Sequence, residues 1–234
     1  MNPNDPNLPL LELAVAAIGK MESRFVFLGG STTGLLVTDA AAVPVRATLD
    51  VDVAVEVLSL VDYHALEREL EQANFVRDHS PDAPICRWIV HGCLVDIMPS
   101  DEKILGFGNR WFPEAINTAQ VTLLPSGNQI RVVTPPMFLA TKLEAFKSRG
   151  GGDFLASHDL EDIVTVVDGR PSLIAEIETT SSRVRTYVSE EIRSLLEKIG
   201  FRDALYGHVP GDEASQARVP IIRERLQRIA DFSS

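Results

Sequence analysis

The sequence has few of the features that direct a chain to a membrane or to secretion. Its 234 residues contain no apolar run near the ~20 residues that a membrane-spanning helix needs, and no charged-then-apolar leader opens the chain. It has only two cysteines, Cys86 and Cys93, in neighbouring apolar segments. We expect reduced core thiols there rather than a disulfide or a metal site. We therefore expect a soluble, cytoplasmic protein.

Positive charge is also scarce. The chain has 22 Lys and Arg residues against 33 Asp and Glu residues, which gives a formal net charge of −11. This balance argues against a protein that holds nucleic acid by bulk electrostatics, although it permits a local basic cleft, above all one supplemented by a metal ion. With 45% hydrophobic and 24% charged residues, the composition is that of a globular protein with one large domain or two small ones.

The pattern of residues 48–57 organises the rest of the sequence. Valines alternate there with Asp50, Asp52, Ala54 and Glu56, and this period of two predicts a half-buried β-strand. Alternate side chains of a strand share a face, so Asp50 and Asp52 project side by side. Two neighbouring carboxylates repel each other, and a hard divalent cation such as Mg²⁺ removes that penalty. The strand therefore predicts a metal site.

A glycine turn precedes this strand by about one helix. Residues 24–28 read as a short strand that ends at Gly29, Gly30 and Ser31, and a brief helix follows over residues 34–38. A strand, glycine turn and helix start direct backbone N–H groups and the positive helix end to one place, which suits a phosphate. A plain tight turn is the alternative for these three residues alone, and the aspartate pair downstream favours the phosphate turn.

A third acid lies in a predicted hairpin. Residues 85–90 and 93–98 read as two strands joined at His91 and Gly92, and Asp96 is the only acid inside the apolar second arm. A carboxylate there is costly unless it is paired or binds a metal. It either completes the site of Asp50 and Asp52 as a third ligand or points to water at the end of its strand; we favour the ligand.

The rest of the sequence divides near residues 134–136. Before this point the pattern predicts helices over residues 10–21 and 58–74 and a short strand over 75–79. It also predicts an aromatic loop over 105–113 and a second hairpin over 120–133. The loop either lines a pocket or stacks a base, or it covers an edge of the sheet. After this point the period is helical, with helices over 137–149, from 157, over 171–200 and over 216–232, a glycine break at 150–152 and a loop over 201–215.

These elements predict an α+β fold. We expect a mixed or antiparallel sheet flanked by helices over residues 1–134, followed by a helical C-terminal domain over residues 135–234. In the second part, Lys142 and Arg149 lie on one predicted helix, and Asp159 and Asp162 share a face of the next. Solvated charges are the alternative for the two cations, and a cap or an ion pair is the alternative for the two acids.

Together these residues resemble a known family. Gly29-Gly30-Ser31, Asp50-Val51-Asp52 and Asp96 are similar to the signature of the DNA polymerase β-like nucleotidyltransferase superfamily. The run from Lys142 to Arg149, followed by Asp159-Leu160-Glu161-Asp162, looks like its AbiEii/AbiGii toxin branch, which includes nucleotidyltransferase toxins of bacterial toxin–antitoxin systems. The resemblance covers about residues 25–167.

The resemblance implies a nucleotidyltransferase fold and a role for each residue. Asp50, Asp52 and Asp96 would be metal ligands for Mg²⁺ or Mn²⁺ and, with Lys142, the catalytic residues. The nucleotide-binding residues would be Gly29, Gly30, Ser31, Lys142, Arg149, Asp159 and Asp162. In this arrangement the turn donates hydrogen bonds to the β- and γ-phosphates of an NTP, Lys142 neutralises phosphate charge with help from Arg149, and Asp159 or Asp162 orients Lys142 or the acceptor.

The implied activity is transfer of a nucleoside monophosphate from an NTP to an acceptor hydroxyl, a reaction of the EC 2.7.7 type. If the protein is the toxin of a toxin–antitoxin system, the expected acceptor is tRNA and the expected partner is a cognate antitoxin protein. The acidic net charge counts against a large RNA acceptor. A small-molecule or protein acceptor, and a catalytically silent relative that binds a nucleotide or a partner, are the alternatives.

Overall fold

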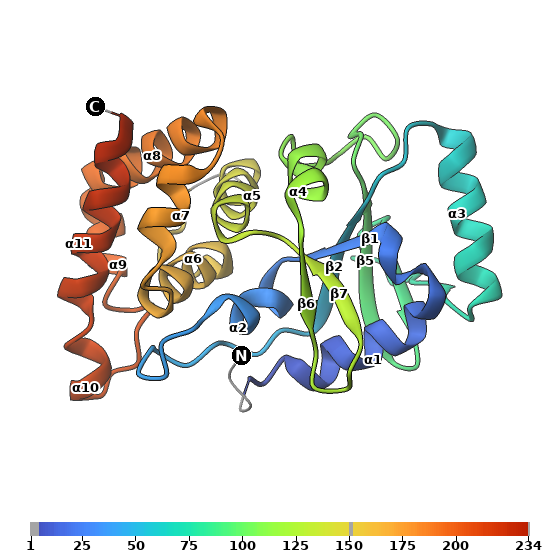
Figure 1. Cartoon of the computed structure of the whole chain (residues 1–234), viewed down its shortest axis with the longest axis horizontal. Coiled ribbons are helices and arrows are strands. Elements are labelled where there is room, and N and C mark those ends of the chain that lie inside the picture. Colours follow the sequence, from blue (N-terminus) through green and yellow to red (C-terminus); the bar gives the residue numbers. More distant parts are fainter. Residues whose placement is uncertain (1–4, 150–151, 234) are drawn as a thin grey trace. The chain divides into compact units, whose positions relative to one another are not determined.

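The computed structural model describes residues 5–149 and 152–233, which form two compact units (Figure 1). The sheet unit consists of Pro6–Thr32 and Ala47–Thr134. The helical unit contains Asp5, Thr33–Arg46 and the chain from Pro135 onward. After Asp5, the chain therefore returns to the helical unit twice, first for Thr33–Arg46 and then at Pro135.

The described residues of the sheet unit form a seven-stranded sheet with the order β3-β4-β5-β2-β1-β7-β6. Its strands are β1 Phe25–Leu28, β2 Asp50–Val55, β3 Val76–Arg77, β4 Arg87–Val90, β5 Cys93–Pro99, β6 Gln120–Leu123 and β7 Gln129–Val132. The pairs β2/β5 and β1/β7 are parallel, and the other neighbours are antiparallel. The sheet is therefore mixed, as the α+β prediction allows.

Helices of the same unit pack on this sheet. They are α1 Leu8–Ile18, which continues as a 3-10 turn over Gly19–Arg24, α3 Leu60–Gln72 and α4 Phe112–Thr118. Helix α1 contacts β2 and β5, and α4 contacts β1 and β2. Helix α3 begins after Ser59, whose Oγ accepts a hydrogen bond from the backbone N–H of Asp62 at 3.1 Å and so caps the helix.

One face of the central strands is core, and the other carries acids. The side chains of Val51, Val53, Val95 and Ile97 are fully buried. On β2, Asp50 and Asp52 alternate with these valines and lie on the opposite face, because side chains alternate along a strand. The strand therefore gains its stability from the valine face.

A two-residue turn sets the pairing of β4 with β5. His91 and Gly92 have φ angles of 49° and 79°, the left-handed conformation that a tight turn between twisted antiparallel strands requires at both positions. The turn places Val90 opposite Cys93 and, three residues further from it, Arg87 opposite Asp96.

The helical unit contains α2 Thr33–Leu36, α5 Pro135–Ser148, α6 His158–Gly169, α7 Leu173–Thr179, α8 Ser182–Glu197, α9 Ile199–Ala204, α10 Glu213–Gln216 and α11 Val219–Ala230, then a 3-10 turn over Asp231–Ser233. Helix α5 packs against α6 and α8, and α11 packs against α8 and α6. Asp168 on α6 is fully buried and accepts hydrogen bonds from Arg218 Nε at 2.7 Å and from the backbone N–H of Val43 at 2.9 Å. This carboxylate holds the segment Thr33–Arg46 within the unit.

Most predicted elements are confirmed, with ends displaced by at most three residues, and one prediction is wrong. The predicted loop over residues 201–215 contains the last four residues of α9 and the first three of α10. The predicted loop over residues 105–113 is confirmed as far as Trp111, and its last two residues begin α4, which has Pro113 in its first turn. Gly150 and Gly151 of the predicted glycine break lie outside the described residues. Cys86 and Cys93 are buried free thiols, as predicted. Across 5–149 and 152–233, every helix is too short or too polar to span a bilayer.

Candidate active site

The chain leaves β1 through a corner that only glycine fits. Gly29 has a φ of 73°, and a Cβ atom built on it would lie 1.9 Å from Oδ2 of Asp52. The Asp52 carboxylate therefore occupies the space that a side chain at Gly29 would take. The carbonyl oxygen of Gly29 accepts hydrogen bonds from both N–H and Oγ1 of Thr32, at 3.2 and 2.9 Å. These bonds close the 3-10 turn Gly30–Thr32, in which Ser31 is buried.

The three predicted aspartates lie on one face of the sheet. Asp50 and Asp52 are two residues apart on β2, and the parallel register with β5 pairs Asp52 directly with Asp96. Paired residues of neighbouring strands point to the same face, so Asp96 joins the other two rather than facing the core. Asp96 is only 7% exposed, which excludes the alternative of a strand-end acid in water.

An arginine bridges two of these carboxylates. Arg87 lies opposite Asp96 in the β4/β5 register. Its Nε and Nη2 donate to Oδ1 and Oδ2 of Asp96, both at 2.8 Å, and Nη2 also donates to Oδ2 of Asp50 at 2.6 Å. The hydrogen bond to Asp96 raises the pKa of Arg87 above its ordinary value, against the opposing effect of burial. The guanidinium thus supplies the positive charge that this acidic face needs.

The donor chemistry of the face suits a hard divalent cation, but the arginine changes the arrangement. Carboxylate oxygens are the ligands that Mg²⁺ prefers, and Asp50 and Asp52 present them side by side. Within the described part of the chain, no group of three or more His, Cys, Asp or Glu side chains is arranged to hold a metal ion, and Arg87 hydrogen-bonds both Asp50 and Asp96. A metal ion held by Asp50 and Asp52 would compete with the bond from Arg87 Nη2 to Oδ2 of Asp50.

The same acids affect the pKa values of the two cysteines, Cys86 and Cys93, in the sheet unit. Burial raises the pKa of the Cys86 thiol to about 12, with further contributions from the negative charges of Asp96 and Asp52. Burial and the charge of Asp50 raise the pKa of Cys93 to about 11. These thiols stay protonated at neutral pH and are unsuited to nucleophilic catalysis.

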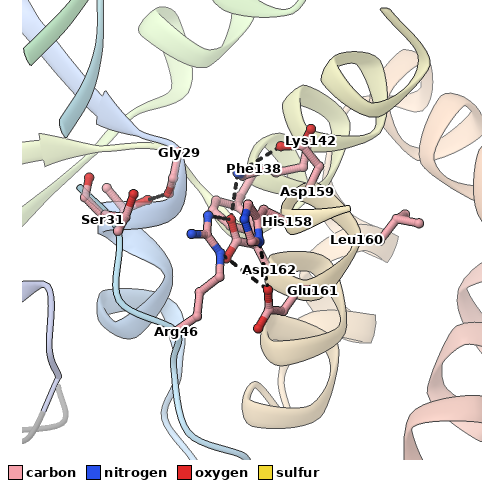
Figure 2. A network of polar contacts seen from close by, with 12 residues as sticks. Gly29, Ser31, Arg46, Phe138, Lys142, His158, Asp159, Leu160, Glu161 and Asp162 are labelled. Atoms are coloured by element: carbon pink, nitrogen blue, oxygen red, sulfur yellow. Dashed lines mark hydrogen bonds and ion pairs between the residues drawn. The ribbon is translucent and has the colours of Figure 1, made fainter. Parts of the chain in front are cut away.

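The helical unit contains a second polar cluster, which centres on Lys142 (Figure 2). Lys142 lies on α5 and is 8% exposed. Its Nζ lies 3.0 Å from Oδ1 of Asp159 and 2.7 Å from Oδ2 of Asp162, both on the first turns of α6. The three-residue spacing therefore places both acids against one ammonium group, as expected for residues on one helical face.

Each of these two acids has a second cationic partner. Arg46 donates from Nε and Nη2 to both oxygens of Asp162, each at 2.9 Å. Burial would lower the pKa of Arg46, but the hydrogen bond and charge of Asp162 outweigh burial and raise it. Arg149 donates from Nη1 to Oδ2 of Asp159 at 2.7 Å, although most of its side chain is exposed. The cluster thus brings three cationic groups onto two buried carboxylates.

One pocket lies beside the Lys142 cluster, and another lies near Glu56 and Leu58, beyond the end of β2 opposite Asp50. In the helical unit, a pocket of about 340 Å³ is lined by Phe146, Arg149, Gly152, Asp153, Ala156, Ser157, His158 and Asp159. In the sheet unit, a pocket of about 380 Å³ is lined in part by Asn109, Arg110 and Pro113 of the aromatic loop. This loop therefore lines a pocket, while its Trp111 is buried in the unit.

Two residues of these clusters were not anticipated from the sequence. Arg87 could have been found, because the two-residue turn at His91 and Gly92 fixes the register that places it opposite Asp96. Arg46 could not, because it lies in an irregular segment 116 residues before its partner Asp162. Both are arginines that bond an aspartate through two parallel N–H groups, the geometry in which arginine and carboxylate match best.

The chain matches no protein-family model and no curated protein. The two residue clusters are therefore the features from which a function can be proposed.

Proposed function

We propose that this protein is a metal-dependent nucleotidyltransferase that moves a nucleoside monophosphate from an NTP to an acceptor hydroxyl. The observation that supports this proposal is the position of Asp52, whose carboxylate lies against the Gly29 corner while Asp50 and Asp96 share its face of the sheet. A glycine turn that meets paired acids provides, in one unit, groups for a phosphate and for its counter-ion.

In this proposal each residue of the sheet unit has a separate task. Asp50 and Asp52 would hold Mg²⁺, which when bound supplies charge neutralisation for the triphosphate. Gly29, Gly30 and Ser31 would donate hydrogen bonds to the β- and γ-phosphates. Asp96 would align the acceptor hydroxyl and help to remove its proton. The acceptor oxygen forms a bond to the α-phosphorus as the bond to the β-phosphate oxygen breaks, and pyrophosphate leaves.

For the helical unit, we propose the role that the family resemblance implies. Lys142 would neutralise phosphate charge, and Asp159 and Asp162, which both contact its ammonium, would fix its orientation. Arg149 would assist, because its exposed guanidinium keeps N–H groups that Asp159 does not use. In the toxin–antitoxin reading the acceptor is tRNA and the partner is a cognate antitoxin; a small hydroxyl compound or a protein is the other class of acceptor.

One observation favours a second candidate, a nucleotide-binding protein without transfer activity. Arg87 neutralises Asp50 and Asp96, and a permanent arginine there would leave only part of the acidic face for a metal ion. In that case the Gly29 corner would still bind phosphate, while no acceptor would be activated.

An isotope experiment separates these candidates. The purified protein is incubated with Mg²⁺, NTPs that carry ³²P at either the α or the γ position, and either total tRNA or small hydroxyl compounds. Transfer predicts that an acceptor gains α-label and never γ-label, and that Asp52→Asn abolishes this while the exposed-surface control Asp82→Asn does not. Label on tRNA alone would eliminate the small acceptors. Binding of NTP with no α-label on any acceptor would leave the nucleotide-binding candidate.

A further inference from the structure

Arg87 lies on the same face of the sheet as Asp50, Asp52 and Asp96, and its positive charge affects how a metal ion can bind there. Arg87 is 18% exposed in its side chain and makes three hydrogen bonds of 2.6–2.8 Å to two different aspartates. Side chains that cross from one strand to the next in this way order the face on which they lie. Arg87 therefore holds the carboxylates of Asp50 and Asp96 in place.

The bonds to the two aspartates differ in strength. Asp96 receives two parallel N–H groups, and its side chain is 9% exposed. Asp50 receives one N–H group, from the same Nη2, and its side chain is 29% exposed. Bidentate, buried ion pairs are held more tightly than single, solvated ones. The bond to Asp50 is therefore the one that opens first.

We propose that Arg87 is a positioning residue of the acidic face, which stays bound to Asp96 while it yields Asp50 to an incoming divalent cation. This inference rests on the proposed function, because it takes Asp50 and Asp52 as the metal ligands. Arg87 fixes the orientation of Asp96, and it competes with the metal for Asp50. Metal-binding affinity is thus set by an arginine that touches neither the metal nor the nucleotide.

The first experiment measures Mn²⁺ binding, with free Mn²⁺ counted by its electron paramagnetic resonance signal. Arg87→Met removes the competing cation, so the Kd for Mn²⁺ should fall about two- to five-fold, the factor that a part-exposed ion pair typically contributes. Arg68→Met, which removes the same charge from the exposed surface of α3 in the same unit, should leave the Kd unchanged. Asp50→Asn should weaken Mn²⁺ binding.

A second measurement uses the unmutated chain and therefore does not depend on the folding of a variant. Mg²⁺ is titrated into ¹⁵N-labelled protein, and the guanidinium resonances of Arg87 are followed. The Nη2 resonance should shift as its bond to Asp50 opens, while the Nε–H resonance, bonded to Asp96, should stay in place. A merely structural arginine would show neither this split nor the change in Kd.

The outcomes separate the inference from the proposed function. If the wild type binds Mn²⁺ through Asp50 and Arg87→Met binds it with the same Kd, or if both resonances stay fixed at saturating Mg²⁺, the inference is wrong and the proposed function stands. If only Arg87→Met binds Mn²⁺, the competition is supported and metal-dependent transfer by the wild type is wrong. If neither protein binds Mn²⁺, with or without an NTP, both proposals are wrong.

Discussion

Replacing Gly29 by alanine tests the contact on which the candidate site depends. The added Cβ would meet Oδ2, Cγ and Cβ of Asp52 at 1.9, 2.6 and 2.8 Å, so the whole aspartate side chain has to move. Alanine would also have to adopt a φ of 73°, which is unfavourable for residues with a side chain. Two separate penalties therefore act at one position.

A matched glycine separates these penalties. Gly127, in the turn between β6 and β7, has a φ of 88°, and a Cβ there would meet no atom within 4 Å. We expect Gly127→Ala to lower the free energy of unfolding by about 1 kcal/mol, the cost of the backbone conformation alone. Gly29→Ala adds the overlap with Asp52, which at about 1–3 kcal/mol for a crowded site gives about 2–4 kcal/mol in total.

The free energy of unfolding is measured in urea by tryptophan fluorescence. Both tryptophans of the chain, Trp88 and Trp111, are buried in the sheet unit, so the signal reports on the unit that holds Gly29. In an Asp52→Ala background, Gly29→Ala should cost at least about 1 kcal/mol less than in the wild type, because the carboxylate no longer stands in the way. Equal costs for Gly29→Ala and Gly127→Ala, or no coupling to Asp52, would refute the close contact.

Three further predictions concern buried groups elsewhere. Lys142→Met leaves Asp159 and Asp162 with one arginine each and should lower the free energy of unfolding, measured by circular dichroism, by about 3 kcal/mol. Lys147→Met on the same helix removes a surface ion pair and should lower it by less than about 1 kcal/mol. Equal losses for the two variants would contradict the buried cluster. Cys86 and Cys93, with pKa values of about 12 and about 11, should not react with a thiol reagent at pH 8 until urea unfolds the chain. Rapid labelling of the native protein would be inconsistent with their burial. Burial lowers the pKa of His208 below its ordinary 6.5, so the unfolded chain binds the proton first as the pH falls. The free energy of unfolding should therefore decrease as the pH drops below about 6.5 and through the folded-state pKa. His208→Gln should lose less stability between pH 7 and pH 5, and an unchanged pH dependence would argue against a neutral buried imidazole.

Local patterns predicted the elements that form the acidic face. The alternation around Asp50 and Asp52 reflects one buried and one polar face of β2, and this is a property of the strand itself. The turn at His91 and Gly92 likewise predicted the hairpin that contains Asp96. That Asp96 shares a face with the other two aspartates depends on the parallel pairing of β2 and β5, which no local pattern specifies.

Long-range pairings account for what the sequence did not reveal. Strand β7 lies beside β1 in parallel although about a hundred residues separate them, and Arg46 reaches Asp162 from an irregular segment. Short helices were the other failure, because α4, α9 and α10 have seven, six and four residues, too few for a helical period to stand out. Tertiary packing rather than intrinsic helix preference stabilises helices of this length.

The most direct test of the central claim is to locate a metal ion on the acidic face. Crystals grown with Mn²⁺ and a non-hydrolysable NTP analogue would show the ion by its anomalous scattering. The proposed function predicts a peak about 2.1 Å from carboxylate oxygens of Asp50 and Asp52, beside the Gly29 corner, with phosphate oxygens completing its coordination. A nucleotide bound away from that corner, or an acidic face on which Arg87 still bridges Asp50 and Asp96 with no ion present, would contradict it.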